Sequence, residues 1–136
     1  MQKTFEIKKH VSQMNNSEVS FLLGAFKAIP QFMWDFTSYS AKRLSERGIT
    51  QEAFKQLFNK YDLIEFHHAD HKKGDPRVLL RSRTALDGSE VCAVFSLRDA
   101  RVVTLWLNTV SNQHDKLVIE AYTKKYDIIQ KWKGRV

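Results

Sequence analysis

The chain has 136 residues, of which 43% are hydrophobic and 27% are charged, with 5 Gly and 2 Pro. This length is typical of one domain, and the composition excludes collagen-like, low-complexity and wholly disordered proteins. A single cysteine, Cys92, excludes an internal disulfide framework and a four-cysteine zinc site, and it favours a reducing compartment. The formal net charge of +7 favours a polyanionic partner such as a nucleic acid.

The start of the chain and its apolar stretches favour a cytoplasmic protein with no membrane partner. Residues 1–6 contain no apolar run of the kind found in secretory signals. The most apolar stretch, residues 19–36, contains Lys27 and Asp35 and is interrupted by Gly24 and Pro30. It therefore differs from a membrane span of about 20 apolar residues, and we expect it to be part of the core.

The first half of the chain predicts helices. Ser17 is expected to cap the first one, and Pro30 ends it or starts a short second one through Met33 and Phe36. The buried face of the first helix follows helical spacing and comprises Leu22, Ala25, Phe26 and Ile29.

Two further helices are predicted around a Gly-Ile-Thr corner. The first runs from Ser38 or Tyr39 to Arg47 and stops at Gly48, where glycine can adopt a left-handed conformation. Thr50 caps the second, residues 51–59, whose buried face comprises Phe54, Leu57 and Phe58.

The second half of the chain predicts strands at residues 61–66, 77–84, 91–97 and 101–108, with a polar loop over 67–76 and a hairpin turn at 86–89. A helix over 115–125 and an extended piece over 126–132 complete the chain. Helices followed by an antiparallel meander predict an α+β fold, with N-terminal helices packed on one face of a small antiparallel sheet. The other face is then available for a ligand.

Alternation along the predicted strands defines two candidate ligand-binding rows on that open face. Arg77, Arg81 and Arg83 share one face of residues 77–84 with Leu79, either as solvated charges on an edge strand or as phosphate ligands. In residues 101–108, we expect Val103, Leu105 and Leu107 to meet the helices. The open row of that strand comprises Thr104, Trp106 and Asn108, with Trp106 either a stacking platform for a base or a half-buried aromatic.

A third candidate group lies on the helix that begins at residue 38 or 39. Tyr39, Arg43 and Arg47 follow one another at a spacing of four residues and so share a stripe of that helix. Glu46 is a competing partner that could hold Arg43 in an ordinary surface ion pair.

The polar loop supplies Lys72 and Lys73 as candidate RNA ligands and three histidines, His67, His68 and His71. The three histidines are either surface groups or catalytic bases, for which the ordinary histidine pKa near 6.5 is suited. A third alternative is a metal site formed by His67 and His71 with Asp70. The positive charges of the two lysines would repel a divalent cation, so that no metal is expected. Among the histidines, His68 is the preferred catalytic base. His10 and His114 are expected at the surface, and Cys92 is expected to be a small buried hydrophobe.

Three segments together resemble the barnase–EndoU–colicin–RelE superfamily of small endoribonucleases: residues 42–50 (KRLSERGIT), 77–84 (RVLLRSRT) and 101–106 (RVVTLW). The likeness covers residues 38–108 and is greatest to an uncharacterised bacterial and phage branch; the helical corner before the sheet also resembles the phage endoribonuclease RegB. Where that branch carries a histidine, this chain has Tyr39. The chain length predicts one domain over 1–136, and the polar residues 1–16 are expected to be a flexible segment. The extent of the resemblance leaves residues 109–136 as a C-terminal extension.

The resemblance implies a metal-independent endoribonuclease without a cofactor, which cleaves single-stranded RNA by 2′-OH attack to a 2′,3′-cyclic phosphate in a bacterial or phage-infected cell. Arg81 and Arg83 would hold the phosphate with help from Arg43 and Arg47; Tyr39 or His68 would move protons; Thr104 and Trp106 would position the nucleotide. The expected partner is messenger or transfer RNA, with an antitoxin or host protein. The alternatives are a non-catalytic RNA- or DNA-binding module and a regulator that binds a host protein.

Overall fold

A computed structural model describes residues 5–70, 76–83, 88–109 and 128–132. Its elements are β1 (Phe5–His10), η1 (Val11–Gln13), α1 (Asn16–Ala28), η2 (Gln31–Met33), β2 (Asp35–Phe36), α2 (Ser38–Glu46), α3 (Gln51–Gln56), β3 (Tyr61–Asp70), β4 (Arg77–Ser82), β5 (Ser89–Ser96), β6 (Arg101–Thr109) and α4 (Ile128–Trp132). The fold is α+β, as predicted. Among the described residues, no helix has the length and apolar character needed to cross a membrane.

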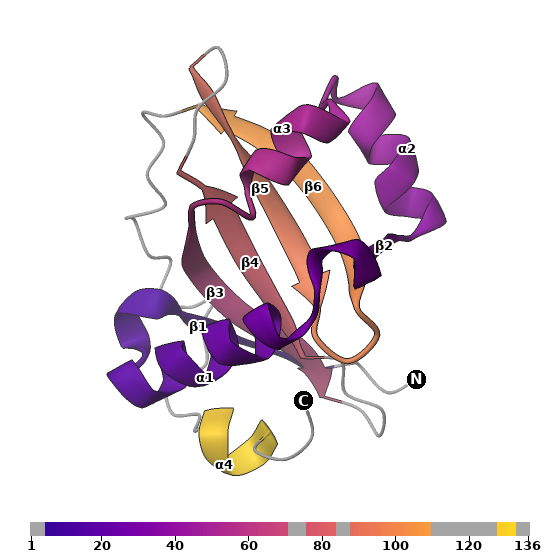
Figure 1. The fold of residues 1–136 in the computed structure, drawn as a ribbon. Coiled ribbons are helices and arrows are strands. Elements are labelled where there is room, and N and C mark those ends of the chain that lie inside the picture. The colour runs from indigo at the N-terminus through magenta and orange to yellow at the C-terminus, as the bar shows by residue number, and fades with distance from the viewer. Residues whose placement is uncertain (1–4, 71–75, 84–87, 110–127, 133–136) are drawn as a thin grey trace.

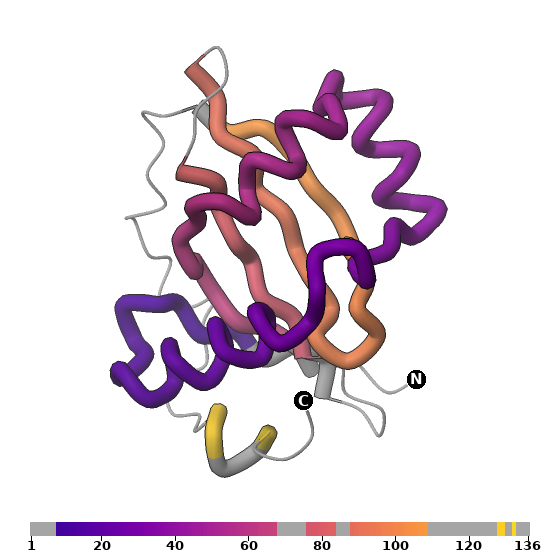
Figure 2. Tube along the Cα trace, viewed as in Figure 1, coloured from indigo at the N-terminus to yellow at the C-terminus, as the bar shows by residue number. Residues whose placement is uncertain are grey.

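The sheet has six strands in the order β1-β3-β4-β5-β6-β2. All neighbours are antiparallel except β2, which pairs with β6 in parallel over Asp35 and Phe36. The sheet is therefore mixed, whereas the sequence predicted an antiparallel one. Figure 2 shows the chain leaving α1, crossing the ends of β5 and β6, and then joining β6 as β2.

The helices lie on one face of the sheet, as predicted: α1 and α3 cross it, and α2 lies along β6 (Figure 1). The core on this face is built around Phe95 of β5. Its ring centroid lies 4.9 Å from that of Phe26 in α1 and 5.0 Å from that of Trp34, both in edge-on contacts. Phe54 of α3 lies 6.2 Å away. Aromatic pairs at these separations add to the stabilisation from burial.

The sequence predicted the corner between α2 and α3 correctly from the residues that end one helix and begin the next. Gly48 has a φ of 66°, the left-handed conformation expected after a helix end. The Thr50 side chain accepts a hydrogen bond from the backbone N–H of Ala53 and so caps α3. The α1 cap was predicted wrongly. Asn15 occupies it instead of Ser17, and Asn15 and Glu18 exchange side-chain and backbone hydrogen bonds in a capping box.

Three segments differ from the predicted secondary structure. Residues 5–10, within the segment expected to be flexible, form β1 and pair with β3. Residues 67–70, expected in a loop, continue β3. Residues 128–132, expected to be extended, are helical. The hairpin residues 84–87 and the predicted helix at 115–125 lie outside the described residues.

A buried ion pair joins β1 to α1. The Lys9 Nζ lies 2.8 Å from both carboxylate oxygens of Glu18, whose residue is only 2% exposed. The same carboxylate accepts hydrogen bonds from the backbone N–H groups of Asn15 and of Ile128, 110 residues away. Burial raises the pKa of Glu18, but hydrogen bonds from Lys9, Ile128 and Asn15 outweigh burial, so the net pKa is lowered from 4.5.

We expect the Glu18→Gln variant to lose about 3 kcal/mol of unfolding free energy, because the buried charge of Lys9 loses the carboxylate that faces it. The wild-type stabilisation is complete above pH 4.5 and is lost as the pH falls through the lowered, folded-state pKa. Urea unfolding at pH 7 and pH 3 measures both effects. The exposed Glu52→Gln is the control and should change stability by less than about 1 kcal/mol. Equal losses in the two variants would refute this role for Glu18.

Candidate nucleic-acid interface

The α2 stripe, which we define as Tyr39, Arg43 and Arg47, forms as the sequence predicted. The Arg43 guanidinium carbon lies 4.6 Å from the centre of the Tyr39 ring, a cation–π contact. Arg47 Nη1 donates a hydrogen bond of 2.8 Å to the backbone carbonyl of Leu105 in β6. The stripe is therefore fixed against the outer edge of β6.

The charges around the stripe are unequal. Glu46 forms an ion pair with Arg43, as the competing interpretation predicted, and its carboxylate also lies 3.7 Å from Lys42 Nζ. These partners are exposed to solvent, which makes their ion pairs weak. Residues 38–47 thus carry three cations, Lys42, Arg43 and Arg47, against the single carboxylate of Glu46, and this surface keeps a positive excess.

Tyr39 is the residue whose chemistry this arrangement changes. Hydrogen bonding with Arg43, the charge of Arg43 and the charge of Arg47 together lower the pKa of the Tyr39 phenol below 10. The ring is 50% exposed, so the phenol is accessible to a ligand. A tyrosine beside two guanidinium groups gives up its proton more readily than an ordinary one.

The arginine that the sequence analysis placed at the centre of the site, Arg81, is buried. It is 4% exposed, and its Nε lies 2.7 Å from the carboxylate of Glu90 in β5. A guanidinium in a buried ion pair cannot leave its partner for a phosphate without a large desolvation penalty. Arg81 is therefore a structural residue in this fold, and the prediction that it holds the phosphate is not supported by its position.

The other two β4 arginines also differ from the predicted row. Arg83 follows the end of β4, is exposed, and forms an ion pair with Asp62 of β3, which raises the pKa of Arg83 through a hydrogen bond and the carboxylate charge. Arg77 is half-buried and lies opposite His67 of β3 in the strand register. The three side chains do not form one free phosphate-binding row.

The sheet face expected to be open is instead largely buried. Leu79, Cys92 and Val94 on this face are each at most 6% exposed, and they pack with Ile64 into a second apolar cluster. Trp106 lies opposite Cys92 and packs against this cluster, where it is partly buried. Its position matches the half-buried aromatic that the sequence analysis gave as the alternative to a stacking platform. Apolar side chains on both faces of central strands are typical of a sheet that is covered on both sides.

The row on β6 is altered by a bulge. The register shifts between Val94 and Phe95, so that Val103 is the extra residue and packs with the second cluster instead of meeting the helices. Thr104 lies opposite Val94 and Asn108 opposite Glu90, both partly buried. Leu105 is fully buried in the helix-side core, as predicted, whereas Leu107 is 40% exposed.

The predicted catalytic histidine is not close to the α2 stripe. His68 belongs to β3 and pairs with Ile7 of β1, whereas the stripe borders β6. Strands β4 and β5 lie between them, a separation of about 14 Å at the usual strand spacing. His10, expected at the surface, is 7% exposed, and its ring accepts a hydrogen bond from the Ser12 backbone N–H. Lys72, Lys73, His71 and His114 lie outside the described residues.

Cys92 is fully buried, as predicted. Burial in the second cluster raises the pKa of its thiol to about 11, so that the group stays protonated at neutral pH. A neutral, inaccessible thiol is a poor nucleophile. Cys92 is thus part of the core.

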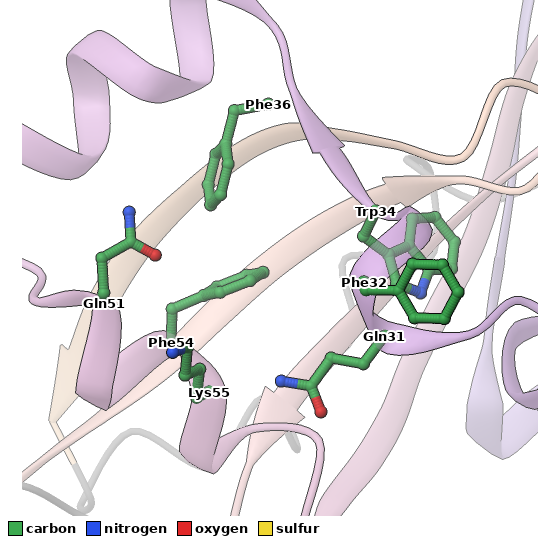
Figure 3. Close-up of a pocket in the computed structure, with 7 residues that line it drawn as sticks. All are labelled: Gln31, Phe32, Trp34, Phe36, Gln51, Phe54 and Lys55. Atoms are coloured by element: carbon green, nitrogen blue, oxygen red, sulfur yellow. The ribbon is translucent and has the colours of Figure 1, made fainter.

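The structure also contains an aromatic pocket that the sequence analysis missed. Phe32, Trp34 and Phe36 from the η2–β2 segment and Phe54 from α3 form its walls, and Gln31, Gln51 and Lys55 supply polar groups (Figure 3). The sequence analysis expected Pro30 either to end the first helix or to start a short second one through Phe36, whereas the structure has η2 over Gln31–Met33 followed by β2. The aromatic residues of the segment are spaced by two. That spacing is typical of an extended segment with one aromatic face, and it could have indicated the pocket.

Comparison of the chain with protein-family models, with curated proteins and with solved structures finds no match. The endoribonuclease resemblance therefore stays a prediction from the sequence, and the site must be argued from its own geometry.

We expect the Arg43→Gln variant to raise the pKa of Tyr39 toward 10, because the hydrogen bond and the charge that lower it are both removed. Tyrosinate absorbance measures this as the difference between each protein and its Tyr39→Phe counterpart. The exposed Arg98 provides the control variant Arg98→Gln, which should leave the Tyr39 midpoint unchanged. An identical midpoint in wild type and Arg43→Gln would show that the two side chains do not interact in solution.

Proposed function

We propose that the protein binds single-stranded RNA along the α2 stripe and the adjoining edge of β6. The observation that carries the proposal is the placement of Arg43 and Arg47 beside an exposed Tyr39, on a helix with a positive excess. Guanidinium groups match phosphate oxygens and keep their charge at every physiological pH. The net charge of +7 supports a polyanionic partner for the chain as a whole.

A second function, RNA cleavage, is favoured by the lowered pKa of Tyr39. In this reaction a base takes the proton of the ribose 2′-OH, the 2′-oxygen attacks phosphorus, and the 5′-oxygen leaves with a proton from an acid. The products are a 2′,3′-cyclic phosphate and a 5′-hydroxyl. Tyr39 would serve in one proton transfer, and Arg43 and Arg47 would stabilise the charge that develops on the phosphate.

In this proposal the phosphate contacts come from α2 and not from β4. Arg81 and Arg83 form ion pairs with Glu90 and Asp62, whereas Arg47 donates a hydrogen bond to a neutral backbone carbonyl. The roles in a toxin system or in a phage takeover of the host remain proposals based on the resemblance; growth arrest on expression in a bacterium would support them.

We expect Arg43→Ala to weaken binding of a single-stranded RNA about tenfold at 0.1 M salt and to reduce the slope of log affinity against log salt by about one, because one phosphate contact is lost. Filter binding or anisotropy over a salt series measures both quantities. Arg98→Ala, which removes an exposed arginine at the β5–β6 turn, should change the affinity less than twofold. Equal losses in both variants would mean that α2 has no special role, and negligible wild-type affinity at about 0.15 M salt would favour the regulator that binds a host protein.

We expect incubation with RNA in EDTA to yield 2′,3′-cyclic phosphate ends, and Tyr39→Phe to slow their appearance about 100-fold, because one proton transfer is lost. The Tyr39→Phe variant keeps the aromatic ring and should bind RNA within twofold of wild type. Intact RNA in the presence of normal binding would identify the protein as a non-catalytic module.

A further inference from the structure

The aromatic pocket is a cavity of about 440 Å³ between the η2–β2 segment and α3. This volume lies in the range of sites that enclose small organic ligands. Figure 3 shows the rings of Phe36 and Phe54 on one side of the pocket and those of Phe32 and Trp34 on the other. An aromatic ligand between them would have ring faces available for stacking.

The inner walls of the pocket are held by the core. Trp34 is stacked on Phe26 with ring centroids 5.2 Å apart, and Phe36 lies 5.1 Å from Phe54. Phe54 in turn contacts Phe58 at 5.4 Å. These rings cannot turn into the space without disrupting the helix-side core, so that the pocket is formed before a ligand arrives.

The pocket wall contains an unused hydrogen-bond donor. Trp34 is 7% exposed, and its indole Nε1 is one of two buried side-chain nitrogens without a hydrogen-bond partner among the described residues; the other is Arg43 Nε. Buried donors are rarely left without an acceptor in folded proteins. This nitrogen has almost no accessible surface, so that a ligand acceptor would reach it only if a neighbouring side chain moved.

The outer wall and the rim also suit a nucleotide. Phe32 is 84% exposed, which is exceptional for a large apolar side chain and leaves its ring free to stack on a ligand. The amides of Gln31 and Gln51 can both donate and accept hydrogen bonds, as the edges of a base require. Lys55 adds a positive charge at which a phosphate can lie.

The pocket continues the proposed RNA path. Phe36 pairs with Val102 of β6, and Arg47 binds the carbonyl of Leu105 on the same strand. Three residues of a strand span about 10 Å, so that the pocket and the α2 stripe border neighbouring parts of one edge. Sequence-tolerant RNA binding combines such a basic track with aromatic rings on which unpaired bases stack.

We propose that the aromatic pocket binds one unstacked base of the RNA, which stacks on Phe32 and offers its polar edge to the amides of Gln31 and Gln51. This proposal rests on the proposed RNA binding by the α2 stripe and adds the subsite that holds a base. The stripe provides affinity for any phosphate chain, whereas the pocket distinguishes a strand with unpaired bases from a duplex.

The test compares two adjacent exposed side chains, Phe32 inside the pocket and Met33 outside it. We expect Phe32→Ala to weaken binding of a single-stranded RNA about tenfold, within the range for loss of one stacked base, with an unchanged salt slope. Met33→Ala should bind within twofold of wild type. Normal affinity of Phe32→Ala together with weakened binding by Arg43→Ala would overturn the proposal that the pocket binds a base and would leave the RNA-binding proposal intact. A wild-type protein that does not bind RNA would overturn both proposals.

Small probes identify the chemical class of the occupant directly. Adenosine 5′-monophosphate should quench tryptophan fluorescence in wild type, and ribose 5-phosphate, which lacks the base, should not. The quenching should disappear in Trp34→Phe, which lacks the fluorophore in the pocket wall, and should persist in Trp106→Phe, so that the pair locates the nucleotide at Trp34. Quenching by N-acetylphenylalaninamide and not by the nucleotide would overturn the proposal and identify a pocket for a protein side chain.

Discussion

The contacts of Phe95 with Phe26, Trp34 and Phe54 connect the sheet to three separate segments of the first half of the chain. Burying one such ring contributes about 1.5–3 kcal/mol, and the pairs add to this. Because Trp34 and Phe54 also face the pocket, the same contacts that hold the helices on the sheet fix the pocket walls. Stability and the geometry of the candidate site therefore depend on one set of rings.

The positive charge of the chain is distributed between two kinds of environment. Arg81 is buried with Glu90, whereas Arg43 and Arg47 lie at the surface of α2. The strand arginine thus belongs to the contact between β4 and β5, whereas the arginines of the α2 stripe lie where a polyanion could reach them. A count of arginines in the sequence could not separate these roles, since burial and pairing depend on the neighbouring strand.

The features that the sequence predicted correctly are those with local causes. Gly48 and Thr50 end one helix and begin the next through interactions within a few residues. The α2 stripe follows from helical spacing alone. The alternation that separates Leu79 from the helix-side core likewise follows from strand geometry. These properties require no knowledge of distant segments.

The features that were missed depend on distant partners. Residues 5–10 form a strand only because β3 offers them an edge, and residues 67–70 stay extended because β1 covers them. The bulge that turns Val103 away from the helices is decided by the register with β5. The burial of Glu18 likewise depends on Ile128, 110 residues away. None of these partners can be identified from the spacing of residues in one segment.

The pairing between β2 and β6 covers only two residues of β6, from Arg101 to Val102. Beyond it, the carbonyl of Leu105 would be an unpaired acceptor on the outermost long strand, and such borders recruit strands from other molecules. Arg47 donates a hydrogen bond to that carbonyl and places a charged, bulky group at the edge of β6. The same side chain that would attract a polyanion thereby opposes the pairing of this strand with a strand of another molecule.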